Sequence, residues 1–368
     1  MADLATTVTV IDACGRARFP VLLLSEPGMG KSSLIRGMAR TEGVPCETVL
    51  GSIREPSDFA GLPVVGDDGV RLEPPNWAKR LKEADAGFLF LDELTTCPQS
   101  VHAAMLAVAL DRTVGDLRLP WDVKIVAGAN PPDSAADGHE IPAPLANRFC
   151  HVDYAPSVED WLDGMTTGWA APPPSRAVGA DRMRREQRAA LVRGFIHTRP
   201  DRLDCGPGED AAAAGRAWPS RRTWAELAKV LAYVRDDDMA ALHAVVFGIV
   251  GEGAGIEFLE WWRNADLPDP ESVIDDPSSV DWSARPDRVW AVLAGVCGWA
   301  TARGTVEAWR KAWGPLVAAA EAGAPDVAAA AARQLTRIRP ARATVPAAVR
   351  RFQPILEAAG LADDEAAA

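Results

Sequence analysis

The sequence predicts an α/β fold: a parallel sheet covered by helices on both faces, followed by two helical regions. Short, continuous apolar runs alternate with stretches of helical spacing near the start of the chain, which is the pattern of parallel strands buried on both faces. Beyond Tyr154 only helical spacing continues. We therefore expect an α/β core over 1–155, a helical lid over 156–270, and a helical extension with an acidic tail over 271–368.

Five apolar runs are the strand candidates of the core, and two further segments resemble hairpins. The strand candidates are 20–24, 44–50, 87–91, 123–129 and 149–153, and the hairpin candidates are 64–72 and 113–119. Beyond the core, helices are expected at 181–198, 220–235, 238–250 and 253–263. The tryptophans of the last part are expected to form a core stripe, which is commoner than a ligand site.

The first strand candidate is followed by a glycine loop that closes on Gly30-Lys31-Ser32. Backbone N–H groups of such a loop and the helix after it form an anion site, and the two glycines permit positive φ angles. Lys31 would reach the β- and γ-phosphates, and the Ser32 hydroxyl would ligate magnesium. The predicted nucleotide-binding residues are Glu26, Pro27, Gly28, Met29, Gly30, Lys31, Ser32 and Ser33.

One position departs from the usual phosphate-loop pattern G-x-x-x-x-G-K-[ST]. Ser25 stands where that pattern has its first glycine. The alternative to a phosphate loop is an ordinary strand–turn–helix that contains Gly-Lys-Ser by chance. The flanking strand and helix, together with carboxylates downstream, favour the phosphate loop.

The strand at 87–91 ends in two adjacent carboxylates, Asp92 and Glu93. Ligands of open α/β sheets bind at such strand ends. Asp92 would hold magnesium, and Glu93 would act as general base or position the attacking water. The alternative is a plain strand end that caps the helix beginning near Thr95-Thr96-Cys97-Pro98.

A further strand candidate ends on an amide, Asn130. An Asn at this place can hydrogen-bond both the attacking water and a γ-phosphate oxygen. Because Asn before Pro is also a common turn residue, the alternative is a turn without a catalytic role.

These residues resemble the AAA+ ATPases and, among them, the MoxR group of the helix-2-insert branch. Four segments carry the resemblance beyond the phosphate loop, and it covers about residues 15 to 240. They are 54–63, the hairpin at 64–72 as the insert in helix 2, the Leu-x-x-Arg-Phe segment within 142–149, and 218–224 at the start of the lid helix.

The resemblance implies roles for two arginines. Arg148 corresponds to the arginine finger, which completes the ATP site of a neighbouring subunit, and Arg222 to the lid arginine that touches the γ-phosphate of its own subunit. Arg221 is the rival for the second role. The alternative for Arg148 is a helix cap or a surface ion pair. The resemblance also implies ATP and Mg²⁺ as cofactors and a homo-oligomeric ring, usually a hexamer.

Composition narrows the function classes. The net charge of −12 argues against broad contact with nucleic acid, because such affinity depends on neutralising phosphates with Lys and Arg. Six cysteines without a C-x-x-C pattern are typical of reduced thiols. No signal peptide and no run of membrane-spanning length are seen. We expect a soluble, cytoplasmic protein without membrane insertion, and the Arg- and Ala-rich composition favours a bacterial source.

The leading hypothesis is a MoxR-like ATPase that remodels or matures a protein client as a chaperone. The resemblance implies that the hairpins at 64–72 and 113–119 face the client, and that a von Willebrand factor A domain protein is the partner. Three alternatives stay open: a DNA-directed motor, a nucleotide-gated scaffold with little hydrolysis, and a chelatase-type motor subunit. Ser25 is the feature that favours the scaffold.

Overall fold

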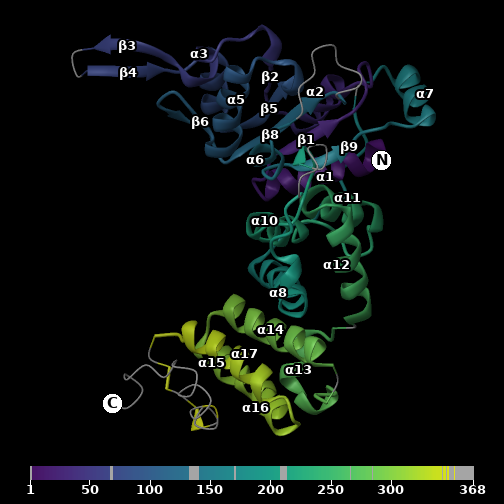
Figure 1. The fold of residues 1–368 in the computed structure, drawn as a ribbon, viewed down its shortest axis with the longest axis vertical. Helices are drawn as coiled ribbons and strands as arrows, with labels where there is room; N and C mark the ends of the chain where they lie inside the picture. The colour runs from purple at the N-terminus through teal and green to yellow at the C-terminus, as the bar shows by residue number, and fades with distance from the viewer. Residues whose placement is uncertain are drawn as a thin grey trace. The chain divides into compact units, whose positions relative to one another are not determined.

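A five-stranded parallel sheet lies at the centre of the first part of the chain (Figure 1). Its strands are β1 (Val21–Leu24), β2 (Cys46–Leu50), β5 (Ala86–Asp92), β8 (Asp122–Ala129) and β9 (Cys150–Asp153). They follow the order β2-β5-β8-β1-β9, and every neighbouring pair is parallel. The sheet confirms the predicted α/β class, and each strand overlaps its predicted run.

The structure is a computed structural model. It describes residues 2–66, 69–131, 141–169, 171–207, 214–265, 267–283, 285–341, 343–344, 346–347 and 352. The two aspartates of the first predicted hairpin turn and the acidic tail at 362–368 lie outside the described residues.

Helices cover both faces of the sheet. They are α1 (Leu4–Arg16), α2 (Lys31–Glu42), α4 (Asn76–Ala84) and α5 (Gln99–Asp111). Ile125 of β8 belongs to the core shared with α4 and α5. Its neighbour Lys124 donates to Asp12 of α1 at 2.9 Å and to Glu42 of α2 at 2.6 Å. Because successive strand side chains point to opposite faces, α1 and α2 lie on the face away from α4 and α5.

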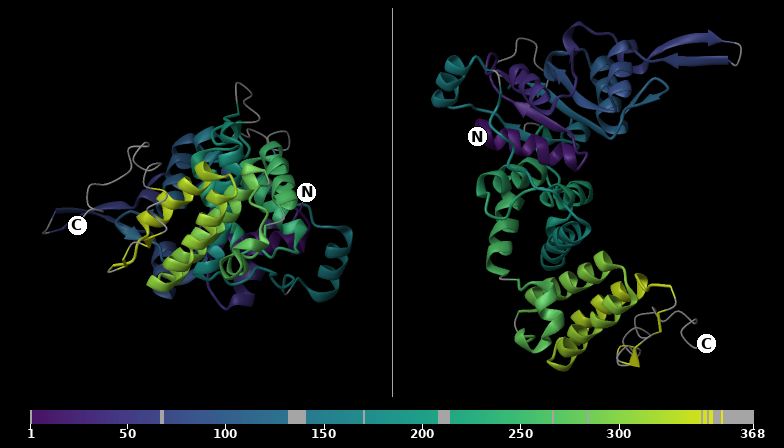
Figure 2. Two further views of the ribbon diagram at one scale, coloured as in Figure 1. Left: turned by 90° about the horizontal axis from the view of Figure 1, so that it is seen from below. Right: turned by 180° about the vertical axis from the view of Figure 1, so that it is seen from behind.

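Two antiparallel hairpins accompany the sheet, as the sequence predicts. β3 (Leu62–Gly66) and β4 (Gly69–Glu73) follow the short helix α3 (Ser57–Ala60) and extend away from the sheet (Figures 1 and 2). β6 (Thr113–Val114) and β7 (Leu117–Arg118) form the second hairpin. The first hairpin exposes apolar side chains, with 83% of Val65 and 68% of Val70 accessible to solvent.

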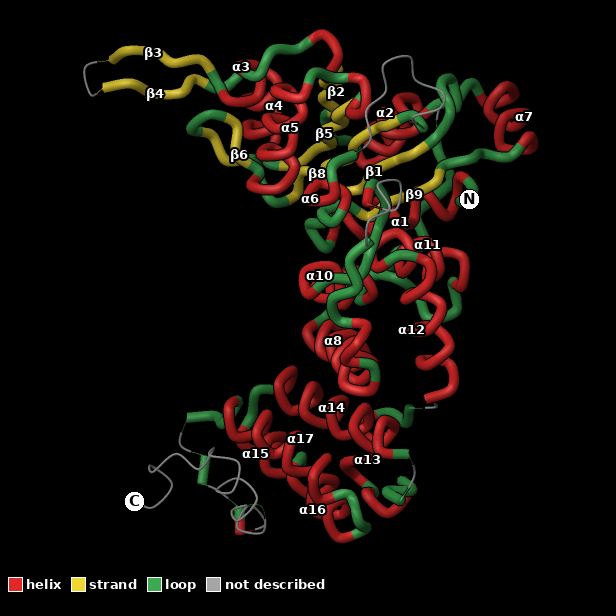
Figure 3. Tube along the Cα trace, viewed as in Figure 1, coloured by secondary structure: helices red, strands yellow, loops and turns green. Residues whose placement is uncertain are grey.

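After β9 the described chain is helical (Figure 3). The helices are α7 (Val158–Thr167), α8 (Arg182–Thr198), α10 (Arg221–Leu231), α11 (Met239–Val250), α12 (Glu252–Ala265), α13 (Pro270–Asp275), α14 (Pro286–Arg303), α15 (Val306–Lys311), α16 (Trp313–Glu321) and α17 (Pro325–Arg337), with short 3₁₀ turns η4 (Pro200–Arg202) and η5 (Pro277–Ser279). Among the described helices, none is long and apolar enough to cross a bilayer.

The chain divides into two compact units that do not follow chain order. The first comprises 1–179 and 204–256, and the second 180–203 and 257–368. Within the first unit, α10 and α11 pack together, and α11 lies against β9 and α1. Within the second, α8 packs along α14, and α14 also contacts α17. The three-part division at residues 155 and 270 stays a prediction.

The second unit has an apolar core of its own. Trp282, Trp299, Trp309 and Trp313 are buried in it, and the indole N–H of Trp309 donates to the Leu335 carbonyl at 2.8 Å. These four tryptophans pack as the predicted core stripe.

Two helices of the first unit are absent from the sequence-based expectation. α1 contains a β-branched run, yet Asp3 caps it by accepting from the Thr6 backbone N–H at 2.7 Å. The Thr7 and Thr9 hydroxyls donate to carbonyls one turn earlier in the chain, so threonine polarity is satisfied inside the helix. α7 begins with a capping box in which Ser157 and Asp160 bond reciprocally.

Candidate active site

The phosphate-loop candidate connects β1 to α2, as predicted. Gly28 and Gly30 have φ angles of +81° and +85°, which L side chains rarely adopt. A Cβ on either would meet no described atom within 4 Å, so the backbone conformation rather than crowding requires glycine here. The loop therefore leaves its backbone open to a ligand at the start of α2, where the unpaired N–H groups favour an anion.

Lys31 is the centre of a buried hydrogen-bond cluster. Its side chain is buried, and Nζ donates to the Ser25 carbonyl at 3.0 Å, to Ser25 Oγ at 2.9 Å and to Asn130 Oδ1 at 2.8 Å. Burial lowers the pKa of Lys31, while the charges of Asp92 and Glu26 act in the opposite direction. The carbonyl, hydroxyl and amide oxygens that accept from this ammonium are all neutral. The ammonium is therefore well placed to receive anionic phosphate oxygens.

Ser25, the departure from the glycine pattern, contributes to this cluster. Its hydroxyl accepts the bond from Lys31 and donates to the Glu26 carbonyl at 3.2 Å. Ser25 also stays in register with the sheet, since its N–H donates to the Ala129 carbonyl at 3.3 Å. The serine thus fits the loop and adds a partner for the lysine.

Ser32 and Asp92 lie side by side, although they belong to different elements. Ser32 Oγ donates to Asp92 Oδ2 at 2.9 Å, and the Glu93 N–H donates to Asp92 Oδ1 at 3.0 Å. Gly128 of the neighbouring strand makes room for the carboxylate, because a Cβ there would lie 2.6 Å from Asp92 Oδ1.

This oxygen pair fits magnesium. Mg²⁺ is commonly held by one or two carboxylates, waters and substrate phosphates rather than by a cage of protein ligands. Within the described ranges no group of three or more His, Cys, Asp or Glu side chains forms a denser metal site. The donor set of Asp92 and Ser32 therefore suits a metal ion that arrives with nucleotide.

Glu93 has a partner that the sequence does not reveal. Its backbone is left-handed, with φ of 59°, and its carboxylate Oε2 accepts a hydrogen bond from Ser52 Oγ. Ser52 belongs to η1 (Gly51–Ile53), which directly follows β2. Since β2 and β5 are neighbours in the sheet, a residue just beyond β2 lies close to one just beyond β5.

Neither carboxylate caps the next helix. The 3₁₀ turn η2 (Leu94–Thr96) follows Glu93 without a side-chain cap, and α5 begins after Pro98 without one either. The helix-cap alternative for Asp92 and Glu93 is therefore wrong.

Asn130 lies directly after β8. Its side-chain oxygen is bonded to Lys31, and its backbone carbonyl accepts from Thr95 Oγ1 at 3.4 Å. A turn role alone does not account for this contact with the loop. Because β5, β8 and β1 are adjacent, Asp92, Asn130 and the loop after β1 meet at one edge of the sheet, where ligands of such sheets bind.

Arg148 follows the short helix α6 (Ala143–Ala146) and is partly exposed. Its backbone N–H donates to the Leu145 carbonyl at 3.0 Å. Among the described residues its guanidinium has no hydrogen-bond or ion-pair partner, so the surface-pair alternative has no support here. The preceding residue, Asn147, is buried and bonds to Trp218 and Ser220.

The two rival lid arginines differ in their contacts. Arg221 forms an ion pair with Asp204, with Nε 2.7 Å from Oδ2. Arg222 is exposed, and within the described part of the chain it has no such partner. Of the two, Arg222 is the one free to meet a ligand.

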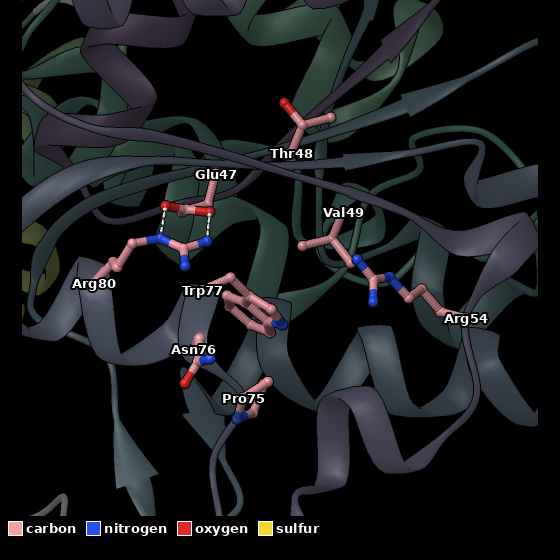
Figure 4. A pocket seen from close by; sticks show the side chains of 8 residues that line it. All are labelled: Glu47, Thr48, Val49, Arg54, Pro75, Asn76, Trp77 and Arg80. Carbon is pink, nitrogen blue, oxygen red and sulfur yellow. Dashed lines mark hydrogen bonds and ion pairs between the residues drawn. The ribbon is translucent and has the colours of Figure 1, made fainter.

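A separate cavity of about 220 Å³ lies beside β2 and contains none of the predicted site residues. Figure 4 shows Arg80 of α4 laid against Glu47 of β2, with two hydrogen bonds of 2.6 and 2.7 Å. This paired arrangement fastens α4 to the edge strand.

Comparison with known proteins agrees with the geometry. Residues 20–149 match the family model of the AAA domain, dynein-related subfamily. The MoxR protein of Methylorubrum extorquens is 30% identical over 139 residues, which is 36% of this chain and 39% of that protein. The MoxR protein of Paracoccus denitrificans is 27% identical over 150 residues, or 39% of this chain and 43% of that protein.

The chain therefore contains a match to the AAA domain over residues 20–149 and resembles the MoxR proteins. Such a domain implies nucleotide binding, and the matched segments span about two fifths of the MoxR relatives, 39% and 43%. A crystal structure of a candidate ATPase from Cytophaga hutchinsonii aligns with a TM-score of 0.40 at 14% identity, covering 68% of this chain and 78% of that one.

Proposed function

We propose that this protein hydrolyses ATP with Mg²⁺ and uses the energy, as a ring, to remodel or mature a protein client. The observation that carries the proposal is the cluster at one sheet edge, where Lys31 bonds to Asn130 and Ser32 bonds to Asp92. The lysine and hydroxyl begin α2 after β1, the carboxylate ends β5 and the amide follows β8, and these three strands are adjacent in the sheet. Phosphoryl transfer needs this combination of positioning and charge.

The residues divide the chemistry among them. Residues 26–33 bind the phosphates through backbone N–H groups, and Lys31 leaves Asn130 to reach the β- and γ-phosphates. Ser32 and Asp92 hold Mg²⁺, which neutralises charge on the phosphates when bound. Glu93 orients the attacking water and accepts its proton, while Asn130 holds the water against the γ-phosphate.

Two arginines complete the proposed site. Arg148 acts in the nucleotide site of the neighbouring subunit, and Arg222 touches the γ-phosphate of its own. Within the part of the chain that the structure describes, both guanidiniums lack an ion-pair partner and both residues are at least partly exposed, which supports this assignment. Because each site then contains residues of two subunits, the active form is a closed ring, and we propose a hexamer.

The proposed client is a protein. The apolar β3–β4 hairpin supplies an exposed contact surface, with Val65 and Val70 at its end. A von Willebrand factor A domain protein is the proposed partner between motor and client. The cytoplasm is the proposed location, and the six cysteines support it because all are free thiols.

One observation favours a second candidate, a nucleotide-gated scaffold with little hydrolysis. Ser52 holds the Glu93 carboxylate, and a carboxylate engaged in this way is withheld from the water. In the motor this bond breaks during each cycle; in the scaffold it persists.

Steady-state ATP hydrolysis per subunit, measured over a range of protein concentrations, separates the two. The motor predicts a specific activity that rises with concentration and disappears in Glu93→Gln. Activity no higher than that of Glu93→Gln at every concentration, despite bound ATP, supports the scaffold. Flat activity that still depends on Glu93 leads to sizing, which distinguishes a monomeric site from a ring assembled at every concentration.

A further inference from the structure

We propose that Asn147 couples Arg148 to the start of α10, so that the subunit's own nucleotide site controls the arginine that serves its neighbour. The inference rests on the proposed function, because it uses Arg148 as a finger in trans and Arg222 as a sensor in cis. It concerns a positioning residue, and it adds communication between sites to the proposed ring.

Asn147 is committed to a single neighbour segment. Only 5% of the residue is exposed. Its side-chain Nδ2 donates to the Trp218 carbonyl at 3.0 Å, and its Oδ1 accepts from Ser220 Oγ at 2.7 Å. Both ends of one carboxamide thus bond to Trp218 and Ser220, two of the three residues that precede α10, more than 70 positions further along the chain.

Ser220 transmits this contact into the helix. It is the N-cap of α10, where its Oγ accepts from the Thr223 N–H at 3.2 Å and Thr223 Oγ1 accepts from the Ser220 N–H at 2.8 Å. Thr223 is fully buried and also donates to the Trp218 carbonyl at 3.2 Å. Arg222 lies within this capped first turn, so a displacement of Arg222 moves the groups that hold Asn147.

The other side of Asn147 is held as well. Arg148 follows it directly, and the preceding residue, Ala146, accepts a 2.8 Å hydrogen bond through its carbonyl from His151 Nε2 of β9. Residues 146–148, the Arg148 segment, therefore lie between strand β9 and the start of α10, which carries Arg222. When the γ-phosphate draws Arg222 toward it, the segment turns about the strand contact and Arg148 shifts with it.

The chemistry requires an amide at position 147. A carboxylate cannot donate to the Trp218 carbonyl, and an apolar residue offers neither bond. Asn147→Leu keeps the approximate shape while removing both bonds. Asn147→Asp keeps the acceptor for Ser220 but places a buried charge beside a carbonyl oxygen.

The test places the mutation in subunits that do not hydrolyse ATP. Wild-type protein is mixed with increasing fractions of Glu93→Gln, and turnover of the wild-type subunits is followed. Glu93→Gln subunits are held in the ATP state, and their Arg148 stays in the position of that state. The activity of neighbouring wild-type subunits should then fall more steeply than the wild-type fraction. With the double variant Glu93→Gln/Asn147→Leu the decline should become proportional, because the neighbour no longer senses that state.

Ser157→Ala is the matched control. It removes the N-cap serine of α7, also from a capping box, without touching the Arg148 segment. Glu93→Gln/Ser157→Ala should therefore produce the same steep decline as Glu93→Gln alone. Identical curves for Glu93→Gln with and without Asn147→Leu would overturn the inference, and so would a proportional decline with Glu93→Gln itself.

A second mixture separates this inference from the proposed function. Arg148→Ala and Lys31→Ala subunits are each inactive alone, but Lys31→Ala subunits still supply Arg148 to a neighbour. Activity restored on mixing supports sites shared between subunits. The mixtures of wild-type protein with the Glu93→Gln variants then decide the role of Asn147. If mixing restores nothing, the shared site fails and the inference fails with it.

Discussion

Lys31 Nζ donates a 2.8 Å hydrogen bond to Asn130 Oδ1, although the two residues lie 99 positions apart. The bond connects the loop after β1 to the end of the adjacent β8. Phosphate oxygens that approach the loop compete with Asn130 for the ammonium. On the proposed function, nucleotide binding should release the Asn130 amide oxygen, which could then accept a hydrogen bond from the attacking water.

Replacing Lys31 should weaken nucleotide binding strongly or abolish it. Lys31→Ala removes a buried cation whose bonds to phosphate are charge-assisted, worth about 1.5–3 kcal/mol each. We expect the dissociation constant for a fluorescent ATP analogue, measured by equilibrium titration, to be at least tenfold larger. Lys229→Ala, which loses a surface pair with Glu226, should bind like the wild type. Equal affinity in both variants would remove Lys31 from the site.

Glu93→Gln should bind ATP with nearly wild-type affinity and lose turnover. The amide keeps the shape of the carboxylate but cannot accept a proton from water, a loss of about 10²–10⁴ in rate. Rings formed with ATP should persist because the nucleotide is not consumed, and size-exclusion chromatography with ATP should show them. Wild-type turnover in this variant contradicts the assigned role.

Arg148→Ala should leave nucleotide binding unchanged and stop hydrolysis. An arginine that stabilises the transferring phosphoryl group contributes about 10³–10⁵ in rate, and the partly exposed Arg148 has no side-chain hydrogen bond or ion pair to lose within the described chain. Binding and turnover should be measured on the same preparation. Arg216→Ala, which breaks a nearby surface pair with Asp153, is the control; equal turnover in the two variants excludes the finger.

Ser52→Ala should raise resting hydrolysis. Glu93 must leave the Ser52 hydroxyl before it can act on water, and a hydrogen bond to a charged group is worth about 1.5–3 kcal/mol. Removing it should accelerate the basal rate by about tenfold without changing ATP affinity. Ser52→Thr retains the hydroxyl and should restore the low basal rate. A lower rate in Ser52→Ala would mean that the serine supports catalysis instead.

His151 should make the fold sensitive to acid. Burial lowers the pKa of His151 to about 4, from an ordinary value of 6.5. Between these values the unfolded chain takes up a proton that the folded chain does not. The contribution of neutral, buried His151 to the free energy of unfolding is therefore complete above pH 6.5 and is lost as the pH falls toward 4. The expected slope is about 1.4 kcal/mol per pH unit.

His151→Gln retains an N–H donor for the Ala146 carbonyl and does not titrate. Urea unfolding of both proteins between pH 7 and pH 4.5 isolates the histidine, because all other groups are common to them. The stability difference should change with pH in the predicted direction. Parallel profiles would show that the His151 imidazole is protonated or exposed before the protein unfolds.

Most of the sheet could be predicted from the sequence because its strands are short apolar runs buried on both faces. The phosphate loop and the strand-end residues Asp92 and Asn130 could be found for the same reason: parallel topology brings strand ends to one edge. α1 escaped prediction because its β-branched residues favour strands, and only the Asp3 cap and the threonine bonds reveal the helix.

Contacts that depend on neighbouring elements could not be predicted. Ser52 meets Glu93 across 41 positions because β2 lies beside β5, and nothing in the local sequence of Ser52 marks it. The ion pair of Arg221 with Asp204, which distinguishes Arg221 from Arg222, likewise could not be predicted. The link from Asn147 to Ser220 also required the position of α10.

The β3–β4 hairpin has only two strands, and its apolar side chains face water. A hairpin without a third strand or a helix on its face is marginally stable in water, and unpaired apolar strand edges invite pairing with other chains. The purified protein should therefore self-associate through the β3–β4 hairpin unless a partner covers the hairpin. A charged substitution at Val65, which is 83% exposed, should keep the protein dispersed in solution and leave the candidate site at the sheet edge unchanged.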